Sequence, residues 1–457
     1  MPAQGPLSAR VRWHARWVVP VATTPIADGT VITEGDRIVW VGQRSDAPSG
    51  GSDEALGDCI LTPGLVNAHT HLDLTVMRGF LEELSFFDWV RTLTRAKRAV
   101  LTDGDLRDAA MLGVAEGLAA GITTFGDTSD SIAPFDALRS LGARGIAFRE
   151  VFGPDPSDAG TALTQLQAQV AIMRGRADSR VRVGVSPHAP YSVSDALFAA
   201  VAEWAARDAL PVAVHIAESD DEEALVVRGA GPFAGYLAGR HVPVAPRAVR
   251  PVVLLEQTGL VRAGTLLIHC VHATAADIGR IADAGCGVAH CPASNAKLGH
   301  GVAPLTAFVA AGVRVGLGSD SMAANNTMDL LGEARLAVLQ QRARTKRSDA
   351  IPARTAFRLA TLGGAEALRL DDEIGTLAPG KQADLVAFAV DPLGEPALDP
   401  VAALIFGAGG VRAHRVIVAG EERVRDGVVH GFDPAVVGRV RQAAARLAEW
   451  RRAESAN

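Results

Sequence analysis

Two histidines, His69 and His71, stand one residue apart in the stretch GLVNAHTHLDLT, directly after an apolar run. On a β-strand, residues i and i+2 point to the same face, so both imidazoles can reach one ion. Imidazole nitrogen is a suitable ligand for Zn²⁺ and Fe²⁺. Two histidines alone are equally compatible with a polar strand end, so the assignment of a metal site depends on partners elsewhere in the chain.

Further residues of ligand type end other apolar runs. His188, His215, His269, His290 and Asp320 all stand at or near such an end. Half of the chain's 12 histidines occupy these positions, whereas random placement would scatter them over helices and loops. His215 and Asp320 could add a nitrogen and an oxygen ligand and leave a position for water, as catalytic metal sites require. A lone histidine there would more often be structural, but the set favours a metal site.

Glu218 follows His215 by three positions. On a regular strand these two side chains would point to opposite faces, so the chain must turn after the strand if both serve one site. In that case Glu218 can move a proton between water and a substrate nitrogen. The alternative is a solvated loop acid, because Glu218 stands beside the polar run SDDEE.

The elements that would position these residues alternate from about residue 61 onward. Short apolar runs with strand character are separated by Ala-, Leu- and Arg-rich segments of helical periodicity. Eight such runs are typical of a (β/α)8 TIM barrel, whose active sites lie at the carboxyl ends of the strands. A doubly wound sheet is the alternative, but no GxGxxG follows the first run. The runs are ILTPGLVNAHTH, GITTFGDTS, RGIAFREVF, VRVGVSPHAP, PVAVHIAES, GTLLIHCVH, GCGVAHCPASN and VRVGLGSDS.

Strand and turn patterns flank the barrel on both sides, as in ADGTVITEGDRIVWVG and IGTLAPGKQADLVAF. We therefore expect a small β-sandwich domain made from the N- and C-terminal segments of the chain. The expected division is residues 1–60 and 371–432 for the sandwich, 61–370 for the barrel, and 433–457 for a C-terminal helix and tail.

Composition excludes several classes of protein. The chain has 457 residues, of which 48% are hydrophobic and 21% are charged, and its net charge is −6 without a basic stripe, so nucleic-acid binding is not indicated. The sequence has no apolar run of 18 residues and no signal-peptide pattern, so we expect no membrane span and a cytoplasmic protein with a small-molecule substrate. The four cysteines form no CxxC pair, and HExxH, GxSxG, Walker and H-x-E…P-C-x-x-C patterns are absent.

The chain resembles the amidohydrolase superfamily, in its branch of metal-dependent deaminases and chlorohydrolases. The likeness covers nearly the whole chain and implies the barrel fold with the terminal sandwich. It is carried by long motifs in the expected order: TPGLVNAHTHLDLTVMRG, SPHAPYSVS, VHIAES, IHCVHAT, HCPASNAKLGHGVAPL, GLGSDSMAANNTMDLL and IGTLAPGKQADLVAF.

The resemblance implies a role for each matching residue. One divalent metal, Zn²⁺ in preference to Fe²⁺, would be bound by His69, His71, His215 and Asp320. Glu218 matches the acid that protonates a substrate ring nitrogen, and His269 matches the residue that holds the hydrolytic water with Asp320. Two-metal members use a modified lysine in the fourth strand, and VRVGVSPHAP has none, so we expect one ion. His188 and Arg149 match substrate-contacting positions, and family members often form homodimers.

For the substrate, NAHTHLDLT and SPHAPYS resemble a subgroup of adenosine-type deaminases that acts on 6-amino-6-deoxyfutalosine in menaquinone biosynthesis. Deaminases of S-adenosylhomocysteine and methylthioadenosine carry a ribose-binding glutamate after the LSFFDWV segment, where this chain has the basic stretch RTLTRAKRAVLTD. Adenosine deaminases, guanine deaminases and triazine hydrolases belong to the same branch and stay open as candidates. A barrel without catalytic activity is disfavoured, because the full ligand set is present.

Overall fold

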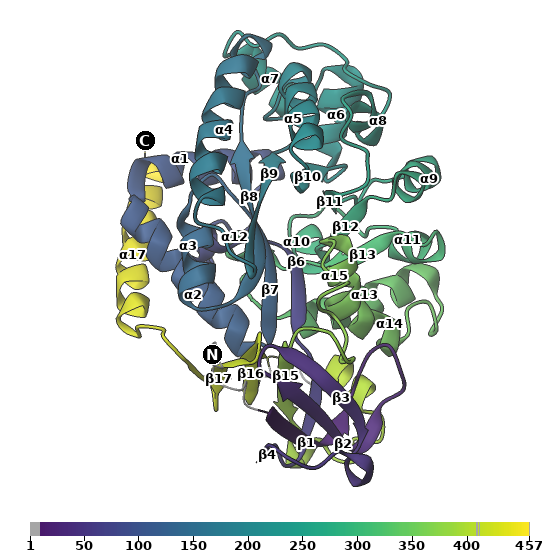
Figure 1. The fold of residues 1–457 in the computed structure, drawn as a ribbon. Helices are drawn as coiled ribbons and strands as arrows, with labels where there is room; N and C mark the ends of the chain where they lie inside the picture. Colours follow the sequence, from purple (N-terminus) through teal and green to yellow (C-terminus); the bar gives the residue numbers. More distant parts are fainter. Residues whose placement is uncertain (1–9, 408–409, 411, 457) are drawn as a thin grey trace, which may run out of the picture.

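The computed structural model describes residues 10–407, 410 and 412–456. Two hydrogen-bonded sheets of nine strands each organise this part of the chain. One sheet is parallel and is surrounded by helices, and the other is built from both ends of the chain and lies at the bottom of Figure 1. The parallel sheet carries the candidate site.

The parallel sheet follows the chain in the order β13-β12-β11-β10-β9-β8-β7-β6-β14. Strand β14 follows β13 after two intervening residues and pairs with β6, so the sheet curls back on its first strand, as in a TIM-like barrel. The predicted apolar runs contain these strands. Their bounds are β6 (Leu65–His71), β7 (Ile122–Ser129), β8 (Arg144–Val151), β9 (Val181–Pro187), β10 (Val212–Ile216), β11 (Thr265–His269), β12 (Gly287–His290), β13 (Arg314–Leu317) and β14 (Asp320–Ser321).

The first predicted run, ILTPGLVNAHTH, is divided between the two sheets. β5 (Cys59–Pro63) belongs to the terminal sheet, and β6 begins two residues later in the barrel. Gly64 lies between them, where a Cβ atom would stand 2.0 Å from Oγ1 of Thr123. A glycine is therefore required for the close passage of the chain from one sheet to the other.

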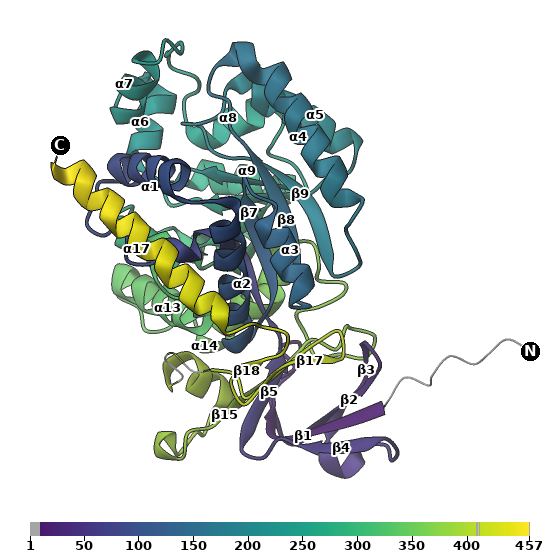
Figure 2. The same cartoon turned by 90° about the vertical axis from the view of Figure 1, so that its left-hand side faces the viewer.

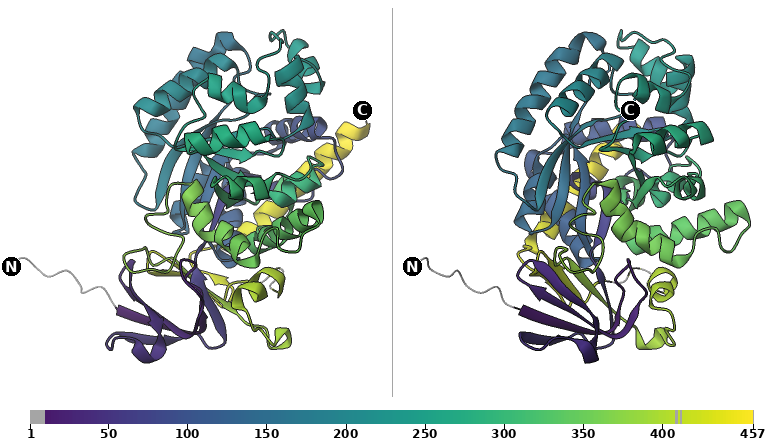
Figure 3. Two further views of the ribbon diagram at one scale, coloured as in Figure 1. Left: turned by 90° about the vertical axis from the view of Figure 1, so that its right-hand side faces the viewer. Right: turned by 45° about the vertical axis from the view of Figure 1, so that its right-hand side comes forward.

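The helices lie around the parallel sheet, as the views of Figure 1 and Figure 3 show. Several begin at capping residues, and in α2 and α9 the side chains of Thr102 and Thr274 form capping boxes with Asp105 and Asp277. The bounds are α1 (Phe86–Val100), α2 (Asp103–Ala119), α3 (Ala133–Ser140), α4 (Ala159–Arg174), α5 (Asp195–Arg207), α6 (Asp220–Arg228), α7 (Pro232–Ala238), α8 (Pro251–Gln257), α9 (Ala275–Ala284), α10 (Pro292–Lys297), α11 (Leu305–Ala310), α12 (Met322–Asn325), α13 (Leu330–Thr345), α14 (Ala353–Arg358), α15 (Gly364–Ala367), α16 (Pro400–Ala402) and α17 (Ala435–Ala456), with the short helical turns η1 (Arg44–Asp46), η2 (Leu72–Met77), η3 (Pro156–Asp158), η4 (Leu359–Gly363), η5 (Pro392–Gly394) and η6 (Ala403–Gly407).

The two ends of the chain combine as expected, but a separate sandwich is not confirmed. The strands of both ends form one hydrogen-bonded sheet, in which β15 pairs antiparallel with β5. A buried ion pair ties this sheet to the barrel: Nε of Arg144, in β8, donates to Oδ2 of Asp384 over 2.8 Å. The remaining strands are β1 (Arg10–Val18), β2 (Ile26–Glu34), β3 (Arg37–Gln43), β4 (Ser52–Ala55), β15 (Leu385–Ala389), β16 (Arg415–Val418), β17 (Glu421–Arg425) and β18 (Val428–Val429).

The C-terminal helix α17 crosses the outer surface of α1 and α2 (Figure 2). Its buried side chains Val436, Val440 and Leu447 share an apolar cluster with residues of η2 and α1. Arg439 forms an ion pair with Asp108 of α2 at 2.7 Å. Within the described ranges, no helix has the length and apolar character needed to cross a membrane.

Candidate active site

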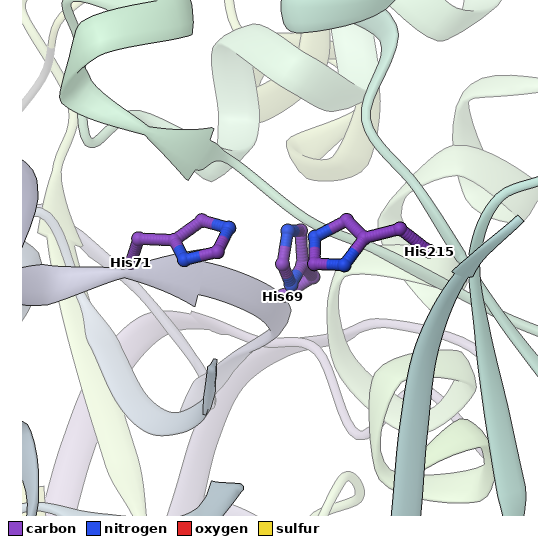
Figure 4. A group of neighbouring side chains, drawn as sticks. All are labelled: His69, His71 and His215. Carbon is purple, nitrogen blue, oxygen red and sulfur yellow. The ribbon is translucent and has the colours of Figure 1, made fainter. Parts of the chain in front are cut away.

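Three of the four expected metal ligands are histidines whose rings meet at the carboxyl ends of β6 and β10 (Figure 4). The ring centroids of His69 and His71 are 4.9 Å apart, those of His69 and His215 also 4.9 Å, and those of His71 and His215 5.4 Å. One nitrogen of each ring lies within 4.8 Å of the other two. The structure therefore brings residues from distant parts of the chain into ligating distance of one another.

A β-bulge in β6 directs these histidines into the barrel. Val66 and Ala68 pack in the barrel interior, so His69 and His71 would face outward on a regular strand. However, Asn67 pairs with Phe125 of β7 and Thr70 pairs with Asp127, so three residues of β6 pass two of β7. The extra residue reverses the alternation, as bulges near active sites commonly do.

Asp320 completes the cluster from β14. Its Oδ1 lies 3.4 Å from Nε2 of His69 and 3.7 Å from Nε2 of His71. Its Oδ2 accepts a hydrogen bond from Oγ of Ser294 at 2.5 Å, and Oδ1 accepts one from the backbone N–H of Ser321 at 2.6 Å. Burial opposes ionisation of Asp320, but the neighbouring His69, His269 and His71 together outweigh burial and hold the pKa of the carboxyl well below its usual range.

The cluster has the chemistry of a metal site. Both ring nitrogens of His69 are buried and have no hydrogen-bond partner within the described part of the chain, which is costly unless a ligand satisfies them. Burial lowers the pKa of His69 to about 4, and burial with the neighbouring histidines lowers the pKa of His215 well below its usual range. Neutral imidazole is the ligating form, so these residues and the ionised Asp320 fit one divalent cation.

Glu218 reaches the same site because the chain turns after β10. Ala217 has a positive φ of 50°, and the backbone N–H groups of Ala217 and Glu218 are held by the carboxylate of Glu222 at 2.8 and 3.0 Å. The Oε1 atom of Glu218 lies 3.4 Å from Nε2 of His269 and 3.5 Å from Nε2 of His300. Burial raises the pKa of Glu218, but these two histidines outweigh it, so the net shift is downward.

His269 ends β11 with a φ of 71°, a conformation that non-glycine residues seldom adopt. Its Nδ1 lies 2.9 Å from Oδ1 of Asn295, an acceptor, so Nδ1 carries the proton and Nε2 faces Glu218. Together with the contact of Ser294 to Asp320, this places α10 behind the site, where it orients two of the expected catalytic groups.

Three residues around the site are not indicated by the sequence patterns. Glu222 is fully buried, although it belongs to the acidic run SDDEE that reads as solvated. His300 lies at the end of the NAKLGH motif, and only the resemblance draws attention to that segment. Glu150 follows Arg149 in β8 and is also buried. None of these has a spacing that reveals its position from the sequence.

A cavity of about 940 Å³ leads from the histidine cluster to the surface. His188 lies at its inner end, with its ring centroid 4.8 Å from that of His215 and Nδ1 2.7 Å from Oγ of Ser192. Arg149 also lines the cavity, and its Nε donates to Oε1 of Gln169 in α4 at 2.8 Å. The two expected substrate contacts thus border one space.

Comparison with known proteins agrees with this geometry. Residues 60–423 match the Amidohydrolase family, so the chain belongs to that family. It is 34% identical over 437 residues to a 5-methylthioadenosine/S-adenosylhomocysteine deaminase of Desulforudis audaxviator (strain MP104C), covering 94% of this chain and 97% of that protein. The protein is a hydrolase acting on C–N bonds, a hydrolytic deaminase of the amidohydrolase superfamily.

Two solved structures are similar over most of the chain. An adenosine deaminase from Xanthomonas campestris with bound zinc superposes with a TM-score of 0.86 at 28% identity, covering 97% of this chain and 100% of that one. The aminofutalosine deaminase of Helicobacter pylori, in complex with methylthio-coformycin, gives a TM-score of 0.79 at 21% identity, covering 90% and 100%. The second likeness shows a shared fold only.

Proposed function

We propose that the protein removes the exocyclic amino group of an adenine-type nucleoside by hydrolysis and releases ammonia. The observation that carries this proposal is the convergence of three imidazoles, Asp320 and the buried Glu218 beside one cavity, which His71 lines. The names of the relatives support the same reaction, since they are deaminases of adenine nucleosides.

His69, His71, His215 and Asp320 hold one divalent metal in this proposal, with Zn²⁺ preferred to Fe²⁺. The zinc in the similar adenosine deaminase structure supports the preference. When bound, the cation supplies the Lewis acidity that makes water nucleophilic near neutral pH. A second ion is not required, because no lysine lies in β9, where two-metal members of the superfamily carry their bridging residue.

The remaining groups handle protons. Glu218 is ionised in the free site, so it first accepts a proton from the attacking water and then donates it to the ring nitrogen beside the carbon that carries the amino group. His269 and Asp320 hold the water, take its second proton and pass it to the amino group, which leaves as ammonia when the C–N bond breaks. His188 and Arg149 contact the substrate from the cavity wall.

The charge of the cavity supports a nucleoside with an acidic 5′ substituent. Cationic side chains outnumber acidic ones by three in its lining (7 − 4). The cationic residues are Arg91, Arg95, Lys97, Arg98, Arg107, Arg149 and Arg240, and the acidic residues are Asp73, Asp103, Asp130 and Glu150. Our first choice of substrate is therefore 6-amino-6-deoxyfutalosine, which carries a carboxylate on its 5′ arm, with a role in menaquinone biosynthesis. S-Adenosylhomocysteine also has a carboxylate, whereas methylthioadenosine and adenosine do not.

The test is ammonia release by the full-length, zinc-loaded protein, with metal content measured in the same preparation. The panel contains 6-amino-6-deoxyfutalosine, S-adenosylhomocysteine, methylthioadenosine, adenosine, guanine and a chloro-triazine. We expect the acidic adenine nucleosides to give the highest kcat/KM. Absence of ammonia from every adenine nucleoside at full metal occupancy would overturn the proposal, and release of chloride from the triazine, measured in parallel, would replace deamination by dechlorination.

A further inference from the structure

Glu150 is a buried carboxylate that faces the interior of the barrel near the histidine cluster. Strand β8 pairs regularly with both of its neighbours, so Glu150 continues the inward series of Ile146 and Phe148, which pack in the barrel core. Its side chain is only 7% exposed and lines the cavity, and Oε1 has no hydrogen-bond partner among the described residues. A buried carboxylate oxygen without a partner is costly and indicates that a ligand satisfies it.

The charged groups nearest to Glu150 do not neutralise it. Lys97 is shared by Asp73 and Asp130, with Nζ–oxygen distances of 2.9 and 2.6 Å. Arg149 extends from the opposite face of β8 and bonds to Gln169. Burial and the nearby Asp130 raise the pKa of Glu150 well above its usual range, and hydrogen bonds donated by a molecule in the cavity would stabilise its ionised form.

A second metal ion is a poor candidate for that molecule. Ligand-type atoms of Glu150, His188 and His215 lie within 4.8 Å of one another. However, Nδ1 of His215 lies 3.1 Å from the backbone oxygen of His188 and must donate to it, so only Nε2 can bind a metal. That nitrogen belongs to the site with His69 and His71, and a second ion would retain only two protein ligands.

We infer that Glu150 binds the vicinal hydroxyl groups of the substrate's sugar, an inference that rests on the proposed nucleoside substrate. Two adjacent hydroxyl groups are a pair of donors, which matches the two acceptor oxygens of a carboxylate. The position is suitable, because the base must reach the histidine cluster and a carboxylate oxygen of Glu150 lies within 4.8 Å of a ring nitrogen of His215. The residues of helix α1 that line the cavity include no acid, so α1 does not supply this acceptor.

The test combines a change in the protein with a change in the substrate. Adenosine and 2′,3′-dideoxyadenosine are compared for the zinc-loaded wild type and for Glu150→Gln, and the Kd values of inosine and 2′,3′-dideoxyinosine are measured by calorimetry. Hydrogen bonds to a charged group predict that Glu150→Gln lowers kcat/KM for adenosine by about 10- to 100-fold, mainly through KM. For the dideoxy compounds, the wild type and the variant should differ by less than about twofold.

Two further variants make the result interpretable. Glu150→Asp keeps the charge and should recover part of the discrimination between the two nucleosides. Glu203→Gln, a change of the same kind on the exposed face of α5, should leave kcat/KM unchanged for adenosine and for 2′,3′-dideoxyadenosine. An equal loss on both nucleosides would assign Glu150 a purely structural role and overturn the inference. Absence of ammonia from every adenine nucleoside would instead reject the proposed function.

Discussion

The carboxylate of Glu222 accepts a hydrogen bond from the backbone N–H of Glu218 at 3.0 Å and another from that of Ala217 at 2.8 Å. These bonds hold the turn that carries Glu218 from the end of β10 into the site. One buried acid thus positions another, the proposed proton carrier, and Glu222 itself is not among the residues that line the cavity. The stability of this turn depends on pH.

Stability should fall with rising pH because of Glu222. Burial raises the pKa of Glu222 from 4.5 to about 8, so between these values the folded protein retains a proton that the unfolded chain releases. The contribution of Glu222 is fully present below about pH 4.5 and is lost as pH rises through about 8. Chemical unfolding of the wild type and of Glu222→Gln at pH 5 and 8 should show a shallower pH dependence for the variant. Identical slopes would contradict the assignment.

Glu218→Gln should abolish turnover but leave the metal bound. The amide cannot carry the proton from water to the ring nitrogen, and loss of a general acid–base group costs about 10²- to 10⁴-fold in kcat. Ammonia release and metal content are measured on the same sample. Loss of the metal in this variant would mean that Glu218 is a ligand.

His215→Ala should lose both metal and activity, and chelation should inactivate the wild type until Zn²⁺ is restored. His290→Gln is the matched control. His290 is also buried at a strand end, with both ring nitrogens unpartnered, but it belongs to none of the ligand clusters found in the described part of the chain. It should therefore keep its metal. Equal metal loss in both variants would contradict a specific ligand role for His215, because any substitution of a buried histidine at a strand end would then release the metal.

Arg144→Met should destabilise the protein without changing the site. It removes the buried partner of Asp384, and breaking a buried ion pair from one side costs about 3–5 kcal/mol. Denaturant unfolding should show this loss, while kcat/KM at a temperature well below the transition stays within about twofold of the wild type. The exposed pair of Arg347 and Asp349 provides a comparison, since its disruption by Arg347→Met should lower the stability far less than Arg144→Met.

Much of the architecture can be predicted from periodicity. Buried parallel strands give apolar runs that stand out against amphipathic helices, so the sequence indicates the strands of the barrel and their carboxyl ends. The division of the first run at Gly64 is not predicted, because it depends on the pairing of β5 with β15, more than 300 residues away. The same limit applies to the terminal sheet, where sequence patterns do not show which strands pair.

For the candidate site too, the sequence predicts the residues but not the pairing and burial that position them. The positions of His69, His71, His215 and Asp320 are expected from spacing and resemblance, and their roles remain predictions. The bulge in β6 that turns the histidines toward the barrel interior cannot be recognised in the sequence, because it depends on the register in which β6 pairs with β7. Nothing in the sequence distinguishes Glu222 from the acids beside it, and only the turn of the chain buries it. Pairing into a homodimer also remains a prediction.

Helix α1 has the cavity on one side and α17 on the other. Its Trp89 and Leu93 border the cavity and also belong to the apolar cluster that includes Leu447 of α17. The last helix therefore braces one wall of the cavity. Substitutions in the last helix can therefore change the range of substrates without changing the reaction. For the same reason, a C-terminal fusion tag is a poor choice when substrate specificity is measured.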